Sequence, residues 1–125
     1  MPNVSSVLGD GPVFPWGTGR APLEDLSIDG DLYRLKVLWI IDPDRYDGPT
    51  LIRGARIDGP SAPVLFFYLD HGPYAELRLG RQGWVYGGTG MREFNSETGF
   101  PGIGCYAYQV DGLGIQYTVV VEILE

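Results

Sequence analysis

Apolar and polar side chains alternate along several short segments of the chain, a period of two residues that is typical of β-strands with one buried face. The segment 115–125, IQYTVVVEILE, is rich in β-branched residues, as half-buried strands often are. Its apolar face consists of Ile115, Tyr117, Val119, Val121 and Ile123. The segment 32–41, LYRLKVLWII, has a similar face made of Tyr33, Leu35, Val37, Trp39 and Ile41. We predict that both segments are strands.

A third segment with alternating side chains is 105–112, CYAYQVDG. Tyr106, Tyr108 and Val110 share one face there, and Cys105 lies on the other. The sequence DGLG follows and is a turn signal, so we predict a closing hairpin. Tyr106, Tyr108 and Cys105 then have structural roles, as does Trp39 in the earlier strand. Free cysteine is among the most buried residue types.

Shorter strands are predicted at 12–17, 50–59, 62–70, 74–80 and 83–88. Gly54, inside the second of these, indicates a bulge or a close approach of two backbones. In the fourth we expect Ala75, Leu77 and Leu79 to point inward. The segment 89–104, TGMREFNSETGFPGIG, reads as a long loop. About eight short strands separated by turns predict an all-β fold, an immunoglobulin-like antiparallel β-sandwich of two sheets.

The composition limits the class of protein. A chain of 125 residues is one domain, for which we expect a flexible N-terminal arm over 1–12 and a sandwich over 13–125. The net charge of −7 disfavours nucleic acid and anionic membranes as partners. No apolar run approaches the ~20 residues of a transmembrane helix, and the single cysteine excludes an internal disulfide.

Two resemblances follow from these segments. PGIGCYAYQVDG resembles the hairpin of the last two strands in immunoglobulin-like domains, and this resemblance implies that the ring of Tyr106 lies in the core and its hydroxyl binds backbone. KVLWIIDPDRYDGPTLIRGARIDGP, AELRLG and PGIGCYAYQVDG together resemble a group of uncharacterised bacterial secreted proteins and lipoproteins. That likeness covers most of the chain from Lys36 and implies no activity. It implies an extracytoplasmic location, with a leader or lipid anchor that MPNVSSVLGDGP does not provide.

Catalytic candidates are few. Cys105 could act as a nucleophile if the single histidine, His71, lay beside it as a base. Glu93 and Glu97 could form the carboxylate pair of a glycoside hydrolase. Nothing in the sequence brings either pair together, and we expect no enzymatic activity.

A metal site has one weak candidate. Asp42, Asp44 and Asp47 fall within one turn, DPDRYDG, and closely spaced carboxylates can bind calcium. The spacing differs from that of an EF-hand loop, and aspartate in turns usually bonds its own backbone. We expect no metal and no cofactor.

Aromatic residues give the strongest indication of a binding function. Five of them stand where burial is not guaranteed: Trp16, Trp84, Tyr86, Phe94 and Phe100. Exposed rings on a sandwich can stack on sugars or dock a protein; alternatively, these rings close the ends of the sandwich. We expect a non-enzymatic envelope or secreted domain that acts by protein–protein interaction, adhesion or self-assembly, with the N-terminal arm as a possible added strand. The alternative is a carbohydrate-binding module that uses Trp84 and Tyr86.

Overall fold

The computed structural model describes residues 11–16, 19–69, 71–80, 84–85 and 90–125, and at 84–85 it describes the backbone alone. Twelve strands make up most of this part of the chain: β1 (Val13–Trp16), β2 (Arg20–Pro22), β3 (Ser27–Asp29), β4 (Leu32–Ile41), β5 (Thr50–Arg56), β6 (Leu65–Tyr68), β7 (His71–Tyr74), β8 (Leu77–Leu79), β9 (Trp84–Val85), β10 (Arg92–Phe100), β11 (Gly104–Gly112) and β12 (Ile115–Leu124). The 3₁₀ turn η1 (Leu23–Asp25) is the one helical segment among these residues. No helix in the described ranges is long and apolar enough to cross a membrane.

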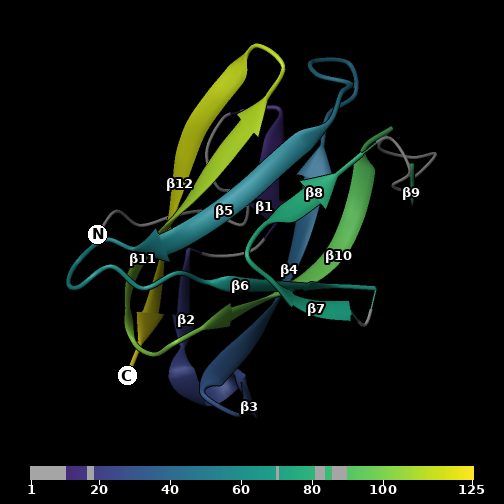
Figure 1. Ribbon diagram of the computed structural model, residues 1–125. Helices are drawn as coiled ribbons and strands as arrows, with labels where there is room; N and C mark the ends of the chain where they lie inside the picture. The colour runs from purple at the N-terminus through teal and green to yellow at the C-terminus, as the bar shows by residue number, and fades with distance from the viewer. Residues whose placement is uncertain (1–10, 17–18, 70, 81–83, 86–89) are drawn as a thin grey trace.

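The strands form two sheets, which confirms an all-β sandwich (Figure 1). The first sheet has the order β1-β4-β10-β6-β7, with β3 also beside β4 and β9 beside β10. The second has the order β2-β12-β11-β5-β8. All pairs are antiparallel except β2 with β12, which run parallel. The described residues form four more strands than the eight expected. Three of them, β2, β3 and β7, are too short to carry an alternation that a sequence pattern could reveal, and the fourth is β10.

The core lies between the sheets and uses the predicted faces. Trp39 of β4 meets Tyr108 of β11 edge to face, with ring centroids 5.1 Å apart. Both side chains are at most 2% exposed, and Val119, Val121 and Ile123 of β12 are buried beside them. Burial of a large apolar side chain stabilises a fold by about 1.5–3 kcal/mol, so these strands supply much of the driving force for folding.

The hairpin of β11 and β12 is confirmed, with nine residue pairs in register from Gly104 with Ile123 to Gly112 with Ile115. The hydroxyl of Tyr106 donates a hydrogen bond to the carbonyl oxygen of Gly102 at 2.8 Å, and its ring is 1% exposed. This is the arrangement of the tyrosine corner in immunoglobulin-like sandwiches. In Figure 1 the hairpin lies beside β5. The last two strands of an immunoglobulin-like domain likewise share a sheet with one earlier strand, in the order C-F-G.

The prediction of a long loop over 89–104 is wrong. Residues 92–100 form β10, a central strand that pairs with β4 along nine positions and with β6 along four. Two of its inward positions are hydroxyl residues, and polar residues at these positions made the segment look like a loop in the sequence. Both hydroxyls have partners inside the sandwich: Ser96 Oγ donates to the carbonyl of Val37 at 2.9 Å, and Tyr108 donates to Thr98 Oγ1 at 2.9 Å. A satisfied hydroxyl can replace an apolar side chain on a buried face.

Three smaller expectations have clear outcomes. Gly54 does mark a close approach, since a Cβ there would lie 2.7 Å from Val64 Cγ2. Ala75 is exposed rather than inward, because β8 begins only at Leu77. Pro12, assigned to the arm, is packed: its carbonyl accepts a hydrogen bond from the N–H of Asp42 at 2.8 Å. Of the predicted arm, residues 1–10 lie outside the described residues.

Candidate functional site

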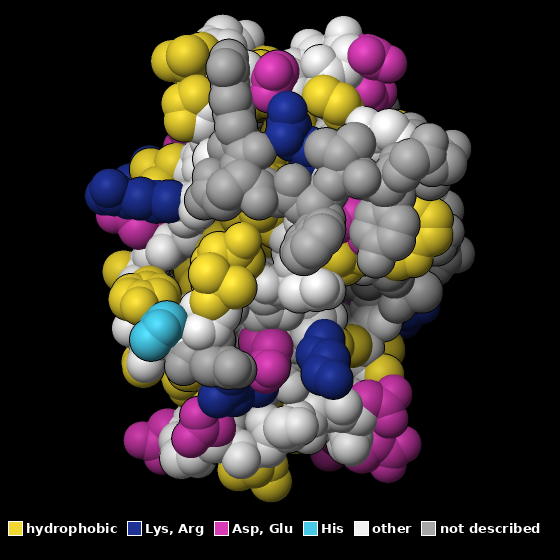
Figure 2. Space-filling model, turned by 90° about the vertical axis from the view of Figure 1, so that its right-hand side faces the viewer, with side chains coloured by type: hydrophobic (Ala, Val, Ile, Leu, Met, Phe, Trp, Pro, Cys, Tyr) yellow, Lys and Arg dark blue, Asp and Glu magenta, His cyan; other side chains and the backbone are white. Residues whose placement is uncertain are grey.

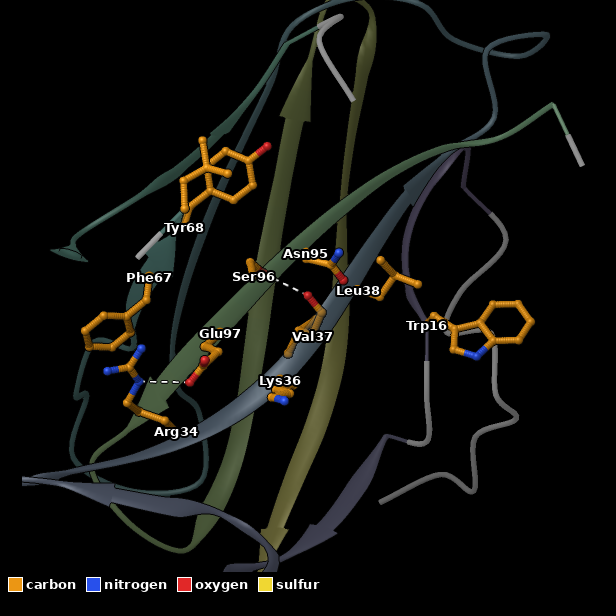
Figure 3. A pocket seen from close by; sticks show the side chains of 11 residues that line it. Trp16, Arg34, Lys36, Val37, Leu38, Phe67, Tyr68, Asn95, Ser96 and Glu97 are labelled. Carbon is orange, nitrogen blue, oxygen red and sulfur yellow. Dashed lines mark hydrogen bonds and ion pairs between the residues drawn. The ribbon is translucent and has the colours of Figure 1, made fainter. Parts of the chain in front are cut away.

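An open groove of about 510 Å³ crosses the outer face of the first sheet. It exists because side chains on β4 and β10 alternate: Trp39 and Phe94 enter the core, so their neighbours Leu38 and Asn95 face outward as a register pair. Trp16 of β1 is paired with Leu38 on the other side. Figure 3 shows the resulting row, with Phe67 and Arg34 at one end, Trp16 at the other, and polar side chains between them.

Arg34 organises one end of the groove. Its Nε lies 2.9 Å from Glu97 Oε1 and its Nη1 lies 3.0 Å from Asp29 Oδ2. The guanidinium also stacks on Phe67, with its central carbon 3.7 Å from the ring centroid. Phe67 is only 7% exposed. The charge of Arg34 is therefore already balanced, and the ring of Phe67 is already covered.

The other end of the groove leaves functional groups uncovered. Trp16 is 51% exposed. Lys36, the single lysine of the chain, is exposed and makes no hydrogen bond or ion pair with the residues that the structure describes. On the opposite side of the groove, at the end of β6, Leu69 is 71% exposed and has a positive φ of 53°. These three side chains are free to contact a ligand.

The second candidate site is the edge of β12. β2 pairs with β12 only from Glu122 to Leu124, and no described strand pairs with the outer edge of Ile115–Val121. The N–H of Glu122 donates to the carbonyl of Gly19 on that edge at 2.6 Å. Backbone directions alternate along a strand, so Gln116, Thr118 and Val120 direct their N–H and C=O groups to the same side. Backbone groups with no strand beside them form a template for another strand.

The other described sheet edges are protected in recognisable ways. β7 contains Pro73, which has no N–H, and its register with β6 is irregular. β1 contains Pro15, β2 ends at Pro22, and β8 spans only Leu77–Leu79. Proline, bulges and short length are the usual means by which natural sheets prevent edge pairing. The free run of β12, IQYTVVV, has no proline and no charged residue.

Figure 2 shows the side of the molecule on which β7 and its His71 lie. Several apolar side chains lie near the histidine there, and acidic and basic side chains are interspersed among the described residues of the face. Tyr74 of β7 is 47% exposed. Among the residues drawn in colour on this side, charges of both signs are therefore mixed.

The aromatic candidates from the sequence are separated by the structure. Phe94 and Phe100 are 1% and 0% exposed, so their assignment to an exposed binding surface is wrong; both belong to the inward face of β10. Trp16 is exposed, as a binding role requires. The side chain of Trp84 and the whole of Tyr86 lie outside the described residues.

The structure does not bring Cys105 and His71 together. Cys105 lies on the outer face of the second sheet, opposite to the inward Tyr106 and Tyr108, whereas His71 is exposed on β7 at the edge of the first sheet. The thiol of Cys105 is buried, and its Sγ lies 4.0 Å from Glu122 Oε2. Burial raises the pKa of this thiol, and the charges of Asp58 and Glu122 raise it further. Little thiolate forms at neutral pH under these conditions, so a nucleophilic role for Cys105 has no support.

The remaining carboxylate candidates also have other partners or positions. Glu93 and Glu97 are four residues apart on β10, which separates their Cα atoms by about 13 Å, and Glu97 binds Arg34. Asp42 Oδ1 accepts the N–H of Asp44 at 3.0 Å, and Asp47 lies 3.5 Å from Arg92. Among the described residues, no group of three or more His, Cys, Asp or Glu side chains could hold a metal ion.

Sequence reasoning missed Arg34, Lys36 and Asn95 as members of one site. The strand 32–41 was predicted, so the outward direction of Arg34 and Lys36 could be expected. Asn95 could not be placed beside them, because the segment around it read as loop. The alternation of Phe94, Ser96 and Thr98 was the available signal, once hydroxyl residues are allowed on a buried face.

Comparison of the chain with protein-family models, with curated proteins and with solved structures found no match.

Proposed function

We propose that this chain is a non-enzymatic, extracytoplasmic binding domain that assembles with copies of itself by strand addition at the edge of β12. The observation that carries this proposal is the run Ile115–Val121, which no described strand covers on its outer side. The bacterial secreted proteins that the sequence resembles support the extracytoplasmic location.

The edge of β12 suits strand addition in length and chemistry. At ~3.3 Å per residue the free run extends for about 20 Å, the length of an ordinary strand. Gln116, Thr118 and Val120 each offer one N–H and one C=O group. Main-chain hydrogen bonds of this kind give affinity in strand addition, and side chains in alternate positions give specificity.

A second copy of the chain is the occupant that fits this edge best. The run contains Thr118, Val119, Val120 and Val121 in succession, and β-branched residues of low charge favour pairing of identical segments. The other described edges, which would otherwise compete, are short or contain proline. Two copies can pair their β12 edges about a two-fold axis, since such an interface uses the same surface on both subunits.

The test is the concentration dependence of sedimentation for two variants of one residue. Thr118→Pro removes an N–H that points away from β11, and proline is tolerated at such edge positions. Thr118→Val keeps the N–H and the strand propensity. We expect the unmodified chain and Thr118→Val to associate as concentration rises, and Thr118→Pro to sediment as a monomer.

Thr118→Lys serves where the proline variant does not fold, because a charge at an edge also opposes pairing. A chain without residues 1–10 decides which strand is added. Loss of association in that chain assigns the added strand to the N-terminal arm, and retained association assigns it to β12 itself. An unmodified chain that remains a monomer at all concentrations overturns the proposal of self-assembly.

A further inference from the structure

We propose that the groove on the outer face of the first sheet is a carbohydrate-binding site, which takes an uncharged glycan with one sugar ring stacked on Trp16. This site is separate from the β12 edge: the groove is lined by residues of β1, β4, β6 and β10, all in the first sheet, together with Leu69 at the end of β6. It is also distinct from the alternative that the sequence suggested, which used Trp84 and Tyr86.

The indole of Trp16 supplies the stacking surface. Val13, in the same strand, is fully buried, whereas Trp16 at the end of the strand leaves half of its surface exposed. Tryptophan is enriched at binding interfaces, where its ring supplies a large apolar contact area and its N–H a polar one. In Figure 3 the indole stands at the end of the groove away from Phe67, where no other labelled side chain covers it.

The floor of the groove supplies hydrogen-bonding groups of both kinds. Lys36 offers donors, Asn95 offers a donor and an acceptor, and Glu97 offers acceptors beside Arg34. A sugar hydroxyl is both donor and acceptor, so a mixed set of this kind can satisfy several hydroxyls of one ring. A ligand site typically combines apolar walls with a few placed polar groups.

Leu69 gives a second, independent indication of function. It follows β6 at the turn into β7 and adopts a φ of 53°, a conformation in which glycine or asparagine is favoured and a bulky residue is an outlier. Its side chain is 71% exposed, so burial does not compensate for the unfavourable conformation. Residues held in such conformations cluster at ligand-binding positions, and Leu69 is placed to close one wall of the groove.

The charges of the site favour an uncharged glycan over an acidic one. Arg34 is already paired with Glu97 and Asp29, which leaves Lys36 as the one unpaired cation among the described residues that line the groove. The whole chain carries a net charge of −7. Like charges repel over distances of about 10 Å at moderate ionic strength, so a polyuronate approaches this surface against repulsion.

The experiment titrates the folded chain with soluble neutral polysaccharides, namely xylan, mixed-linkage β-glucan, glucomannan and dextran, and with polygalacturonate as the acidic arm. Tryptophan fluorescence and calorimetry provide two readouts. We expect saturable binding to at least one neutral polysaccharide and weaker binding to polygalacturonate. Trp16→Ala should lose at least tenfold in affinity, and Asn95→Ala several-fold. Leu113→Ala, at a residue 72% exposed outside the groove, is the matched control and should bind as the unmodified chain does.

Leu69→Asn separates ligand binding from stability. Asparagine suits the positive φ, so this variant should melt at a higher temperature and yet bind the glycan more weakly. Absence of binding to all the neutral polysaccharides overturns the proposal, as does binding that Trp16→Ala leaves unchanged. A preference for polygalacturonate overturns the uncharged class of ligand. Monomeric Thr118→Pro should bind the glycan normally, so failure of self-assembly and failure of this site are distinguishable.

Discussion

The hydroxyl groups of Tyr106 and Tyr108 belong to rings that lie in the apolar core, and each hydroxyl has a hydrogen-bond partner. Tyr106 reaches the backbone of Gly102 at the rim, whereas Tyr108 is fully inside and bonds Thr98, which is itself 0% exposed. A buried hydroxyl without a partner costs about 1–3 kcal/mol. The two residues of the Tyr108–Thr98 pair therefore depend on each other, although they lie in different sheets.

We expect Tyr108→Phe to lower the free energy of unfolding at neutral pH by about 1–2 kcal/mol, because Thr98 Oγ1 is then buried without its donor. Burial raises the pKa of Tyr108, so the folded chain favours the neutral phenol. The stability from this group is complete below the ordinary pKa of about 10 and falls as pH rises above it, because the unfolded chain ionises first. The difference between the two proteins should therefore shrink above about pH 10.

Urea unfolding at neutral and alkaline pH measures this effect. Tyr74→Phe, at a half-exposed tyrosine, is the control and should leave the free energy of unfolding unchanged at both pH values. The prediction is contradicted if the stability that Tyr108→Phe loses relative to the unmodified chain stays constant or grows as the pH rises above about 10.

At the scale of elements, Gly54 allows β5 to pack closely against two neighbours, the segment that leads into β6 and the strand β11. A Cβ at Gly54 would lie 2.7 Å from Val64 Cγ2 and 3.2 Å from the carbonyl oxygen of Ala107. The backbone at Gly54 also accepts the N–H of Val64 at 3.0 Å. The segment that leads into β6 thus packs directly on the strand before it, and this contact fixes where the chain crosses from one sheet to the other.

We expect Gly54→Ala to destabilise the fold by about 1–3 kcal/mol, the usual cost of overpacking. Gly102→Ala is the matched control, because nothing lies within 4 Å of the position of its Cβ. Val64→Ala removes the nearest methyl group, so the double variant should lose less stability than the sum of the two single variants. Thermal unfolding of the four proteins checks this, and strict additivity would show that Val64 is not the obstacle.

The elements that sequence reasoning placed correctly are those whose buried face is continuously apolar. β12 has such a face in Val119, Val121 and Ile123, and β4 has one around Trp39. β10 was missed because Asn95, Ser96 and Gly99 resemble turn residues, although its inner hydroxyls find partners only after the sheets pack. Hydrogen bonds between distant segments leave no local trace in the sequence.

The candidate sites could be predicted only in part, because they too depend on contacts between segments that are distant in the sequence. An exposed role for Trp16 could be proposed from its turn-rich surroundings, and β12 could be identified as a strand. That no described strand covers the outer edge of Ile115–Val121 depends on β2 pairing only from Glu122 onward. The period of a sequence pattern does not encode which strand lies beside another.

At the scale of the whole molecule, two features oppose each other. In the proposed assembly, the edge of β12 that no described strand covers pairs with a second copy, while each copy carries a net charge of −7 and repels the other. The range of this repulsion is about 30 Å at 0.01 M salt and about 8 Å at 0.15 M. Hydrogen bonds between backbones depend little on salt. Ionic strength therefore acts on the repulsion and leaves the attraction almost unchanged.

We expect the association constant at neutral pH to rise several-fold between about 0.01 M and 0.15 M sodium chloride, as measured by sedimentation equilibrium. Binding of an uncharged glycan to the groove should change little over the same range, because that interaction has no net charge to screen. Thr118→Pro should remain a monomer at both salt concentrations, which separates edge pairing from non-specific salting out. An association constant that falls with salt would mean that opposite charges hold the copies together, and the edge of β12, whose free run has no charged residue, would then not be the interface.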